Sequence, residues 1–270
     1  MIGGAVFRCR AYRLKPHLQA MNGKPALEQR YLQVKARIRQ AAQAVARDPD
    51  DVGLLAVSKT FSAGNVAELA ALGQRDFGEN YLQEALGKMA ALAHLRPGWP
   101  ERGLQWHFIG PIQSNKTRKI AESFDWVQSL ADERIAGRLS DQRPPHLPPL
   151  DVCIQVNTSG ESSKSGCPPD LAQGLAQAVA RLPNIRLRGL MAIPEPTDDP
   201  ALQRHRAGEM RELFDRIRAG LPGDTATAFD TLSMGMSGDL EAAVAEGSTL
   251  VRVGTALFGE RQARELQGPG

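Results

Sequence analysis

A lysine at the end of a short apolar run is the residue of this sequence best suited to covalent chemistry. The run Leu54-Leu55-Ala56-Val57-Ser58-Lys59-Thr60 has the length of a β-strand and carries a primary amine near its end. Side chains alternate along a strand, so Leu55, Val57 and Lys59 share one face. Loss of water favours the neutral amine, which is the nucleophile that forms a Schiff base. Two interpretations stay open: a desolvated nucleophile, or a lysine that extends into solvent.

Two glycine-containing segments near the end of the chain have the composition of an anion-binding site. The segment Ser233-Met234-Gly235-Met236-Ser237-Gly238-Asp239 leads into a helix predicted to begin near Asp239, and Gly254-Thr255 follow an apolar run. Glycine permits close backbone approach, hydroxyls donate hydrogen bonds, and the free N–H groups at a helix start favour an anion. Each segment alone is equally consistent with a tight turn that needs a positive φ. Together they predict a site for a phosphate monoester.

An arginine beside the second segment adds a fixed positive charge. Arg252 alternates with Val251 and Val253, so it is predicted to face the interior. A buried guanidinium needs an acceptor, which we expect to be either an internal carboxylate or a ligand atom. A strand-end lysine, a phosphate site and a neighbouring arginine together indicate pyridoxal 5′-phosphate (PLP).

The elements that must position these residues follow a regular alternation. After residue 50, eight apolar runs of strand length alternate with helix-period segments such as Asn65–Leu72. Eight βα units predict a single (β/α)8 TIM barrel, preceded by an extra helix over Leu27–Ala46. In this fold the active face lies at the carboxyl ends of the strands, where Lys59 and the glycine segments fall. The predicted strands are 52–59, 75–79, 105–110, 125–130, 151–158, 185–193, 230–235 and 249–254.

Composition excludes several classes of protein. The 270 residues carry a formal charge of only +3, spread along the chain, which argues against a nucleic-acid partner. The three cysteines lack the spacing of a zinc site or a disulfide framework, so we expect no metal site and a cytoplasmic location. No apolar run approaches the roughly 20 residues of a membrane span. We expect a flexible extension over residues 1–24 and one barrel domain over residues 25–267.

Other reactive residues have simpler interpretations. His107 could act as an acid or base, but a hydrogen-bonded core histidine is the commoner case. Lys116, Arg118 and Lys119 follow the third strand and either form a solvated helix face or steer an anion to the mouth. Cys153 is expected to point into the barrel, and Cys167 to be an exposed thiol with no assigned role.

Six ordered motifs carry a resemblance to a known family. Over roughly residues 25–260 the chain resembles the YggS/PROSC family of PLP-binding proteins, called PLP homeostasis proteins. Departures are confined to the first 24 or so residues and the loop 94–103. The matching segments are Leu55-Ala56-Val57-Ser58-Lys59-Thr60, Phe77-Gly78-Glu79-Asn80-Tyr81, the run from Trp106 to Lys116, Leu190-Met191-Ala192-Ile193-Pro194, Leu232-Ser233-Met234-Gly235-Met236-Ser237 and Val251-Arg252-Val253-Gly254-Thr255.

The resemblance implies a role for each residue of the site. It implies that Lys59 forms the covalent aldimine, that Arg252 lies by the pyridine nitrogen and that Asn80 lies close to the ring. It also implies a barrel similar to the N-terminal domain of alanine racemases. The phosphate is then surrounded by residues of the two glycine segments, namely Ser233, Gly235, Ser237, Gly254 and Thr255.

Three functions stay in play. A carrier would hold PLP without catalytic residues, act in its homeostasis and delivery to PLP-dependent apoenzymes, and exist as a monomer. A racemase-like PLP enzyme would need a second acid/base, for which the sequence offers no evident residue, and the family's racemase relatives have a second domain where this chain stops. A protein for another phosphorylated metabolite would form no aldimine. The arginine cation disfavours a protonated ring, so the carrier is preferred.

Overall fold

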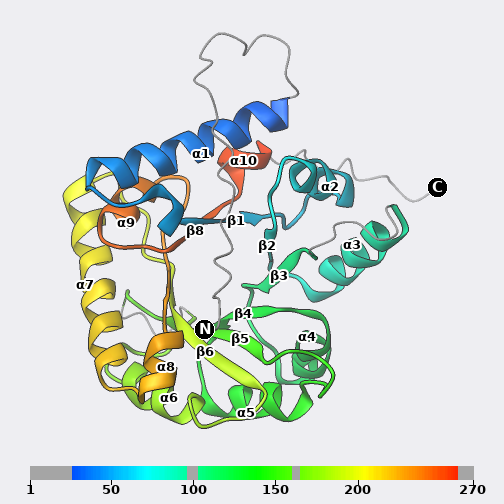
Figure 1. Ribbon diagram of the computed structural model, residues 1–270, viewed down its shortest axis with the longest axis vertical. Coiled ribbons are helices and arrows are strands. Elements are labelled where there is room, and N and C mark those ends of the chain that lie inside the picture. The colour runs from blue at the N-terminus through cyan, green and yellow to red at the C-terminus, as the bar shows by residue number, and fades with distance from the viewer. Residues whose placement is uncertain (1–25, 96–102, 160–164, 261–270) are drawn as a thin grey trace, which may run out of the picture.

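Eight parallel strands form a closed barrel in the order β1 to β8, and helices surround it (Figure 1). The computed structural model of the chain describes residues 26–95, 103–159 and 165–260. This architecture confirms the predicted (β/α)8 barrel. The predicted extension 1–24, most of the loop 94–103 and residues 261–267 lie outside the described residues. The strands are β1 Gly53–Val57, β2 Asp76–Glu79, β3 Gln105–Phe108, β4 Trp126–Leu130, β5 Leu150–Val156, β6 Ile185–Ala192, β7 Thr231–Ser233 and β8 Leu250–Val253.

The helices begin at capping residues that the sequence supplies. Ser62 and Asn65 form a reciprocal capping box at the start of α2, and Asp199 caps α7 with a proline at its first position. These caps satisfy N–H groups that the first turn leaves without partners. The helices are α1 Ala26–Ala44, α2 Ala63–Ala71, α3 Leu82–Leu95, α4 Thr117–Ser123, α5 Glu133–Gln142, α6 Ala172–Val179, α7 Pro200–Ala219, α8 Gly223–Ala228, α9 Leu240–Ala245 and α10 Thr255–Phe258.

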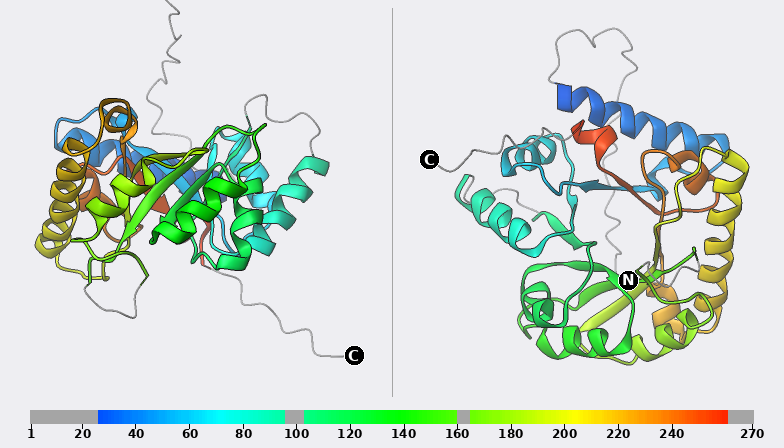
Figure 2. Two further views of the ribbon diagram at one scale, coloured as in Figure 1. Left: turned by 90° about the horizontal axis from the view of Figure 1, so that it is seen from below. Right: turned by 180° about the vertical axis from the view of Figure 1, so that it is seen from behind.

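The extra helix α1 lies across one side of the barrel, beside α9 and α10 (Figures 1 and 2). Its Arg30 donates to the carbonyls of Leu257 and Phe258 at the end of α10, and Arg47, just past α1, donates to the carbonyl of Val244 in α9. These carbonyls belong to the last turns of two short helices, where no N–H group further along the helix can donate to them. Helix α1 therefore holds in place α9 and α10, the helices that follow β7 and β8.

The apolar core lies between the strands and the helices, whereas the inside of the barrel is partly polar. Leu54 and Ala56 belong to the main hydrophobic cluster, while Leu55 and Val57 are buried outside it. The parallel register pairs Leu55 with Arg252, so these two side chains share the interior face. This confirms the inward direction predicted for Arg252 and for the alternate residues of β1.

A bulge in β6 turns an arginine toward the amino-terminal side of the barrel. The register with β5 skips Arg188, which bonds to Asp151 and Asp230 and lies 4.7 Å over the Trp126 ring. The next residue, Gly189, lies so close to β7 that a Cβ there would come 1.7 Å from the carbonyl oxygen of Thr231. The bulge thus depends on glycine because of this backbone contact.

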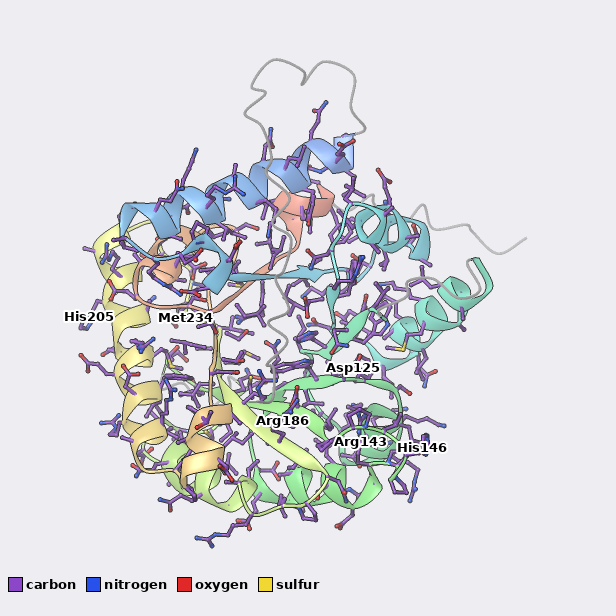
Figure 3. The ribbon with its side chains drawn as sticks, in the orientation of Figure 1. Asp125, Arg143, His146, Arg186, His205 and Met234 are labelled. Atoms are coloured by element: carbon purple, nitrogen blue, oxygen red, sulfur yellow. The ribbon has the colours of Figure 1, made fainter. Side chains whose placement is uncertain are left out.

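The Pro-rich stretch 143–149 is anchored at its first residue. Arg143 is buried and donates to the carbonyls of Ala121, Phe124 and Pro148. Burial lowers the pKa of Arg143 below its ordinary value. Figure 3 shows Arg143 near His146, on the side of the barrel that carries α4 and α5.

We predict that Gly189→Ala will lower the free energy of unfolding by about 3 kcal/mol or more, because the added methyl group must displace the β7 backbone. Gly137→Ala is the matched control: it lies within α5 and no atom outside its neighbours lies within 4 Å of the added Cβ. Gly137→Ala should raise the free energy of unfolding by about 0.5–1 kcal/mol. Urea unfolding followed by circular dichroism measures both, and equal effects would contradict the close contact.

Candidate functional site

Pairing of the first and last strands gathers the predicted site residues at one mouth of the barrel. Ala56 pairs with Val253, and a Cβ on Gly254 would come 3.4 Å from the carbonyl oxygen of Val57. Lys59, two residues past the end of β1, is half-buried beside this junction. The structure therefore brings Lys59 to the same end of the barrel as Gly254 and Thr255, the segment predicted to bind phosphate.

The strand that carries Lys59 ends earlier than predicted. β1 stops at Val57, although the amide of Ser58 still donates to the carbonyl of Gly78 at 3.0 Å. Thr60 has a φ of 71°, in the left-handed region that a β-branched residue rarely occupies. The chain thus turns sharply after Lys59, which lies on a turn and not within the strand.

A buried cluster of charged groups surrounds this turn. Lys88 of α3 donates to Oε1 of Glu79 at 2.7 Å, to Oε1 of Glu84 at 2.6 Å and to the carbonyl of Ser58 at 2.7 Å. The Ser58 hydroxyl also donates to Glu79 Oε1, and the Thr60 amide donates to Glu84 Oε1. Burial is the main cause that raises the pKa of Glu79, against the opposing effect of Lys88. Sequence reasoning missed this cluster.

Asn80, predicted to lie near the cofactor ring, carries a buried acceptor. Among the described residues, its Oδ1 is one of three buried side-chain oxygens without a hydrogen-bond partner. A Cβ on Gly110 would come 2.2 Å from the Asn80 carbonyl, so the loop after β3 packs directly against Asn80. A buried oxygen of this kind is costly unless a donor reaches it.

The loop after β7 is held by contacts that its glycine permits. Gly235 has a φ of 93°, and its Cβ would come 2.6 Å from the Ala243 methyl. Its carbonyl accepts from the Arg252 amide, and the carbonyl of Ser237 accepts from Arg37 of α1. The positive φ expected at a tight turn holds for Gly235, whereas Gly254 has a φ of −114°. A Cβ on Gly254 would make only ordinary van der Waals contacts with Val57, so neither a positive φ nor a close approach requires the glycine there.

Arg252 finds acceptors that neither expected interpretation included. It is buried, with 4% of its surface exposed, and donates to the carbonyls of Ser233 and Ala192 at 2.6 and 2.7 Å and to the Ser233 hydroxyl at 2.8 Å. The expectation that Arg252 needs an internal carboxylate was wrong, because main-chain carbonyls of β7 and β6 accept from it; contact with a ligand atom stays a prediction. Burial lowers the pKa of Arg252 to about 10, which leaves it cationic at neutral pH.

A chain of hydrogen bonds runs from Arg252 across the barrel. The Ser233 hydroxyl donates to Gln128 Oε1 at 2.7 Å, and Gln128 Nε2 lies 2.9 Å from His107 Nδ1. His107 Nε2 lies 3.1 Å from Asp76 Oδ1, which fits a neutral ring that donates at Nε2 and accepts at Nδ1. His107 is therefore a hydrogen-bonded core histidine, as predicted. Gln128 was missed, although a glutamine within an apolar strand is a signal of such a network.

The remaining reactive residues are two buried cysteines and the basic residues that follow β3. Cys153 is fully buried, as expected of an inward-facing residue. Cys167 was expected to be exposed, and this was wrong: its amide donates to the Gln155 carbonyl because the loop folds back onto β5. Burial raises the pKa of Cys167 to about 11. Arg118 and Lys119 are exposed, and Lys119 pairs with Glu122.

A cavity of about 200 Å³ lies between the loops that follow β6 and β7. Its lining includes Glu195, Arg206, Met236 and Asp239, and Lys59 does not line it. A smaller pocket beside it is lined by Met234, which Figure 3 shows on the side of the barrel that carries α7. These hollows adjoin the β7 loop and are separate from the turn that carries Lys59.

No group of three or more His, Cys, Asp or Glu residues in the described part of the chain is arranged to hold a metal ion. None of the described helices has the length and apolar character needed to cross a membrane.

Comparison with known proteins gives matches over most of the chain. Residues 31–262 match the family model of the alanine racemase N-terminal domain. The chain is 62% identical to a pyridoxal phosphate homeostasis protein of Pseudomonas aeruginosa, covering 84% of this chain and 93% of the relative. It is 34% identical to the solved structure of PipY of Synechococcus elongatus with PLP bound, at a TM-score of 0.70, covering 83% of this chain and 100% of that one.

A more distant match concerns the fold alone. The alanine racemase of Corynebacterium glutamicum is 15% identical at a TM-score of 0.60, and the match covers 87% of this chain and 62% of that one. This likeness agrees with the barrel expected from the resemblance to alanine racemase N-terminal domains.

We predict that Gln128→Met will lower the free energy of unfolding by about 2–4 kcal/mol, because Ser233 Oγ and His107 Nδ1 both lose a buried partner. Gln142→Met is the matched control. Its Oε1 is already buried without a partner, so the same substitution should change stability by less than about 1 kcal/mol. Denaturant unfolding distinguishes them, and equal losses would contradict the network.

Proposed function

Because the chain belongs to the family of pyridoxal phosphate homeostasis proteins, we propose that it binds PLP at the mouth of its barrel and acts in PLP homeostasis. One observation carries the proposal. The amine-bearing turn after β1 and the glycine segment after β8 meet at one junction, and the buried Arg252 lies two residues before Gly254 on β8. This arrangement matches the separate needs of an aldehyde, a phosphate and a ring nitrogen.

The residues present fit this cofactor. Lys59, a half-buried residue, supplies an amine, and the turns at Gly235 and Gly254 allow the backbone to come close to a phosphate. Ser237 and Thr255 are proposed to complete the phosphate site; Ser233 is proposed with them, although its buried hydroxyl donates to Gln128 in this structure. The orphaned oxygen of Asn80 offers an acceptor to a donor on the ring or its substituents. Arg252 is proposed to lie by the pyridine nitrogen.

The proposed attachment is a Schiff base. The Lys59 amine adds to the aldehyde carbon of PLP, a carbon–nitrogen double bond forms, and the aldehyde oxygen leaves as water. The reverse reaction consumes one water and restores both partners. Exchange with a second amine also releases the cofactor, because that amine takes the place of Lys59 on the same carbon. Such reversible attachment suits a protein that holds PLP and gives it up.

We assign the protein a non-catalytic role. Bound PLP supplies an electron sink, and a protonated ring nitrogen makes that sink stronger. Arg252 stays cationic at neutral pH, and a cation beside the nitrogen disfavours its protonation. The names of the curated relatives support a homeostasis role. The alternative is a racemase-like enzyme that acts on amino acids.

The wider context is also proposed. We infer that PLP-dependent apoenzymes receive the cofactor, that the protein acts as a monomer and that it lies in the cytoplasm. Three cysteines without disulfide or zinc spacing suit a reducing compartment. Lys116, Arg118 and Lys119 form a basic group after β3 that could attract an anionic cofactor to the mouth.

We predict that borohydride reduction of the PLP-loaded protein will place a pyridoxyl group on Lys59, because reduction makes the Schiff base irreversible. Lys59→Ala should abolish the adduct, and Lys116→Ala, its matched control in the short 3-10 helix after β3, should keep it. Peptide mass spectrometry locates the group. An adduct on Lys116, or one that survives in Lys59→Ala, contradicts the proposed attachment.

We predict that the loaded protein will turn over alanine, serine or ornithine at less than about 0.01 per second, against about 1–1000 per second for ordinary enzymes. Chiral chromatography would detect racemisation, and release of carbon dioxide would detect decarboxylation. Sustained turnover that disappears in Lys59→Ala supports the racemase-like alternative instead.

A further inference from the structure

We propose that Glu84 and Lys88 are positioning residues for Lys59: together they grip the peptide groups on both sides of it and so set the place of its amine. The role of Lys59 rests on the function proposed above. Neither residue belongs to the predicted cofactor site, and both come from α3, the helix after β2. We call the set Glu79, Glu84 and Lys88 the lysine clamp.

The clamp contacts the chain immediately before and after Lys59. Lys88 Nζ donates to the carbonyl of Ser58 at 2.7 Å, and Glu84 Oε1 accepts from the amide of Thr60 at 2.5 Å. Lys88 and Glu84 also bond to each other at 2.6 Å. Glu84 and Lys88, one helical turn apart, therefore form an ion pair that holds the residues on both sides of Lys59.

The turn needs such support because its backbone is strained. Thr60 has a φ of 71°, a conformation that costs of order 1–3 kcal/mol for a residue that is not glycine. A strained residue persists only where its surroundings determine its conformation. Glu84 provides the acceptor for its amide, and the carbonyl of Ser58 accepts from the Phe61 amide as well as from Lys88. Loss of the Glu84 acceptor should let the turn relax.

The burial of the clamp argues for a positional role. Lys88 is 6% exposed and Glu79 is fully buried, so both ions have lost most of their hydration. Replacing a buried ion pair with apolar residues is often neutral or even stabilising, so stability alone gives little reason for one here. Directional bonds to two specific peptide groups provide the reason, because an apolar side chain would leave Ser58 O and Thr60 N without these partners.

Glu79 ties the clamp to the barrel. Its Oε1 accepts from both Lys88 Nζ and the Ser58 hydroxyl, and Oε2 has no hydrogen-bond partner among the described residues. Glu79 is the last residue of β2, so it transmits the position of the rigid sheet to the turn. Glu84 is 30% exposed in its side chain, which makes it the member that can be changed without leaving a deeply buried ion alone.

The test compares Glu84→Ala, Glu84→Gln and the control Gln83→Ala, an exposed neighbour on the same helix, all in the full chain. In the cofactor-free protein, hydrogen exchange at the Thr60 amide should become about tenfold faster in Glu84→Ala. Glu84→Gln keeps a carbonyl oxygen that can accept from Thr60, so its exchange should stay within about twofold of the original protein. Nuclear magnetic resonance measures the exchange, and the thermal midpoint monitors global stability.

The second readout is retention of added PLP. Glu84→Ala should release PLP to a trapping amine about fivefold faster than the original protein, and Glu84→Gln and Gln83→Ala should not. Unchanged exchange at Thr60, or unchanged release in Glu84→Ala, overturns the inference. Equal acceleration in Glu84→Gln also overturns it, since the acceptor is retained. Absence of any Lys59 adduct in the original protein overturns the proposed function instead, while the exchange measurement still decides the clamp.

Discussion

Closure of the barrel by pairing of β1 with β8 is the constraint on which the site depends. The two strands are separated by almost the whole described chain, yet their register is fixed over four residue pairs, from Gly53 with Leu250 to Ala56 with Val253. A shift of one residue would exchange the inward and outward faces of β8. Arg252 would then enter the apolar layer between strands and helices, and Gly254 would no longer lie against Val57. The hydrophobic pattern of both strands therefore also determines the geometry of the mouth.

The inside of the barrel departs from the usual filling of branched apolar side chains. Arg252, Ser233, Gln128 and His107 instead form one hydrogen-bonded chain across it, ending at Asp76. Such a network stabilises a fold only when every member is satisfied, because a buried donor or acceptor left alone costs as much as several good contacts contribute. The network also fixes the guanidinium, since three of its bonds lead to residues of β6 and β7. A charge held in this way cannot follow a moving ligand.

The sequence predicts those features that follow from local periodicity. Alternation along β1 and β8 indicates the inward direction of Leu55 and Arg252, and the glycine segments mark the loops that meet at the mouth. Contacts between distant elements are not visible in this way. In the sequence Lys88 looks like an ordinary helix lysine, because its buried contacts depend on the packing of α3 against β1 and β2. The acceptors of Arg252 are main-chain carbonyls, which cannot be predicted from residue types. The turn at Thr60 was not predicted for the same reason, because the residue that supports it, Glu84, lies 24 positions away in the sequence. Cys167 was wrongly expected to be exposed, because local composition does not show that its loop folds back onto β5.

The two sides of the mouth are held by different elements, and this division bears on how a cofactor could leave. Arg37 of α1 bonds to the Ser237 carbonyl and pairs with Glu241, which fastens the loop after β7. Ionic contacts from α3 hold the Lys59 turn from the other side. Opening of either loop would break several buried or paired bonds at once, so loop opening is a costly route for release. Chemistry at the Lys59 nitrogen breaks none of them. If PLP is attached to Lys59 as proposed, its release from a mouth built this way is therefore best controlled by water or a competing amine that reaches this nitrogen.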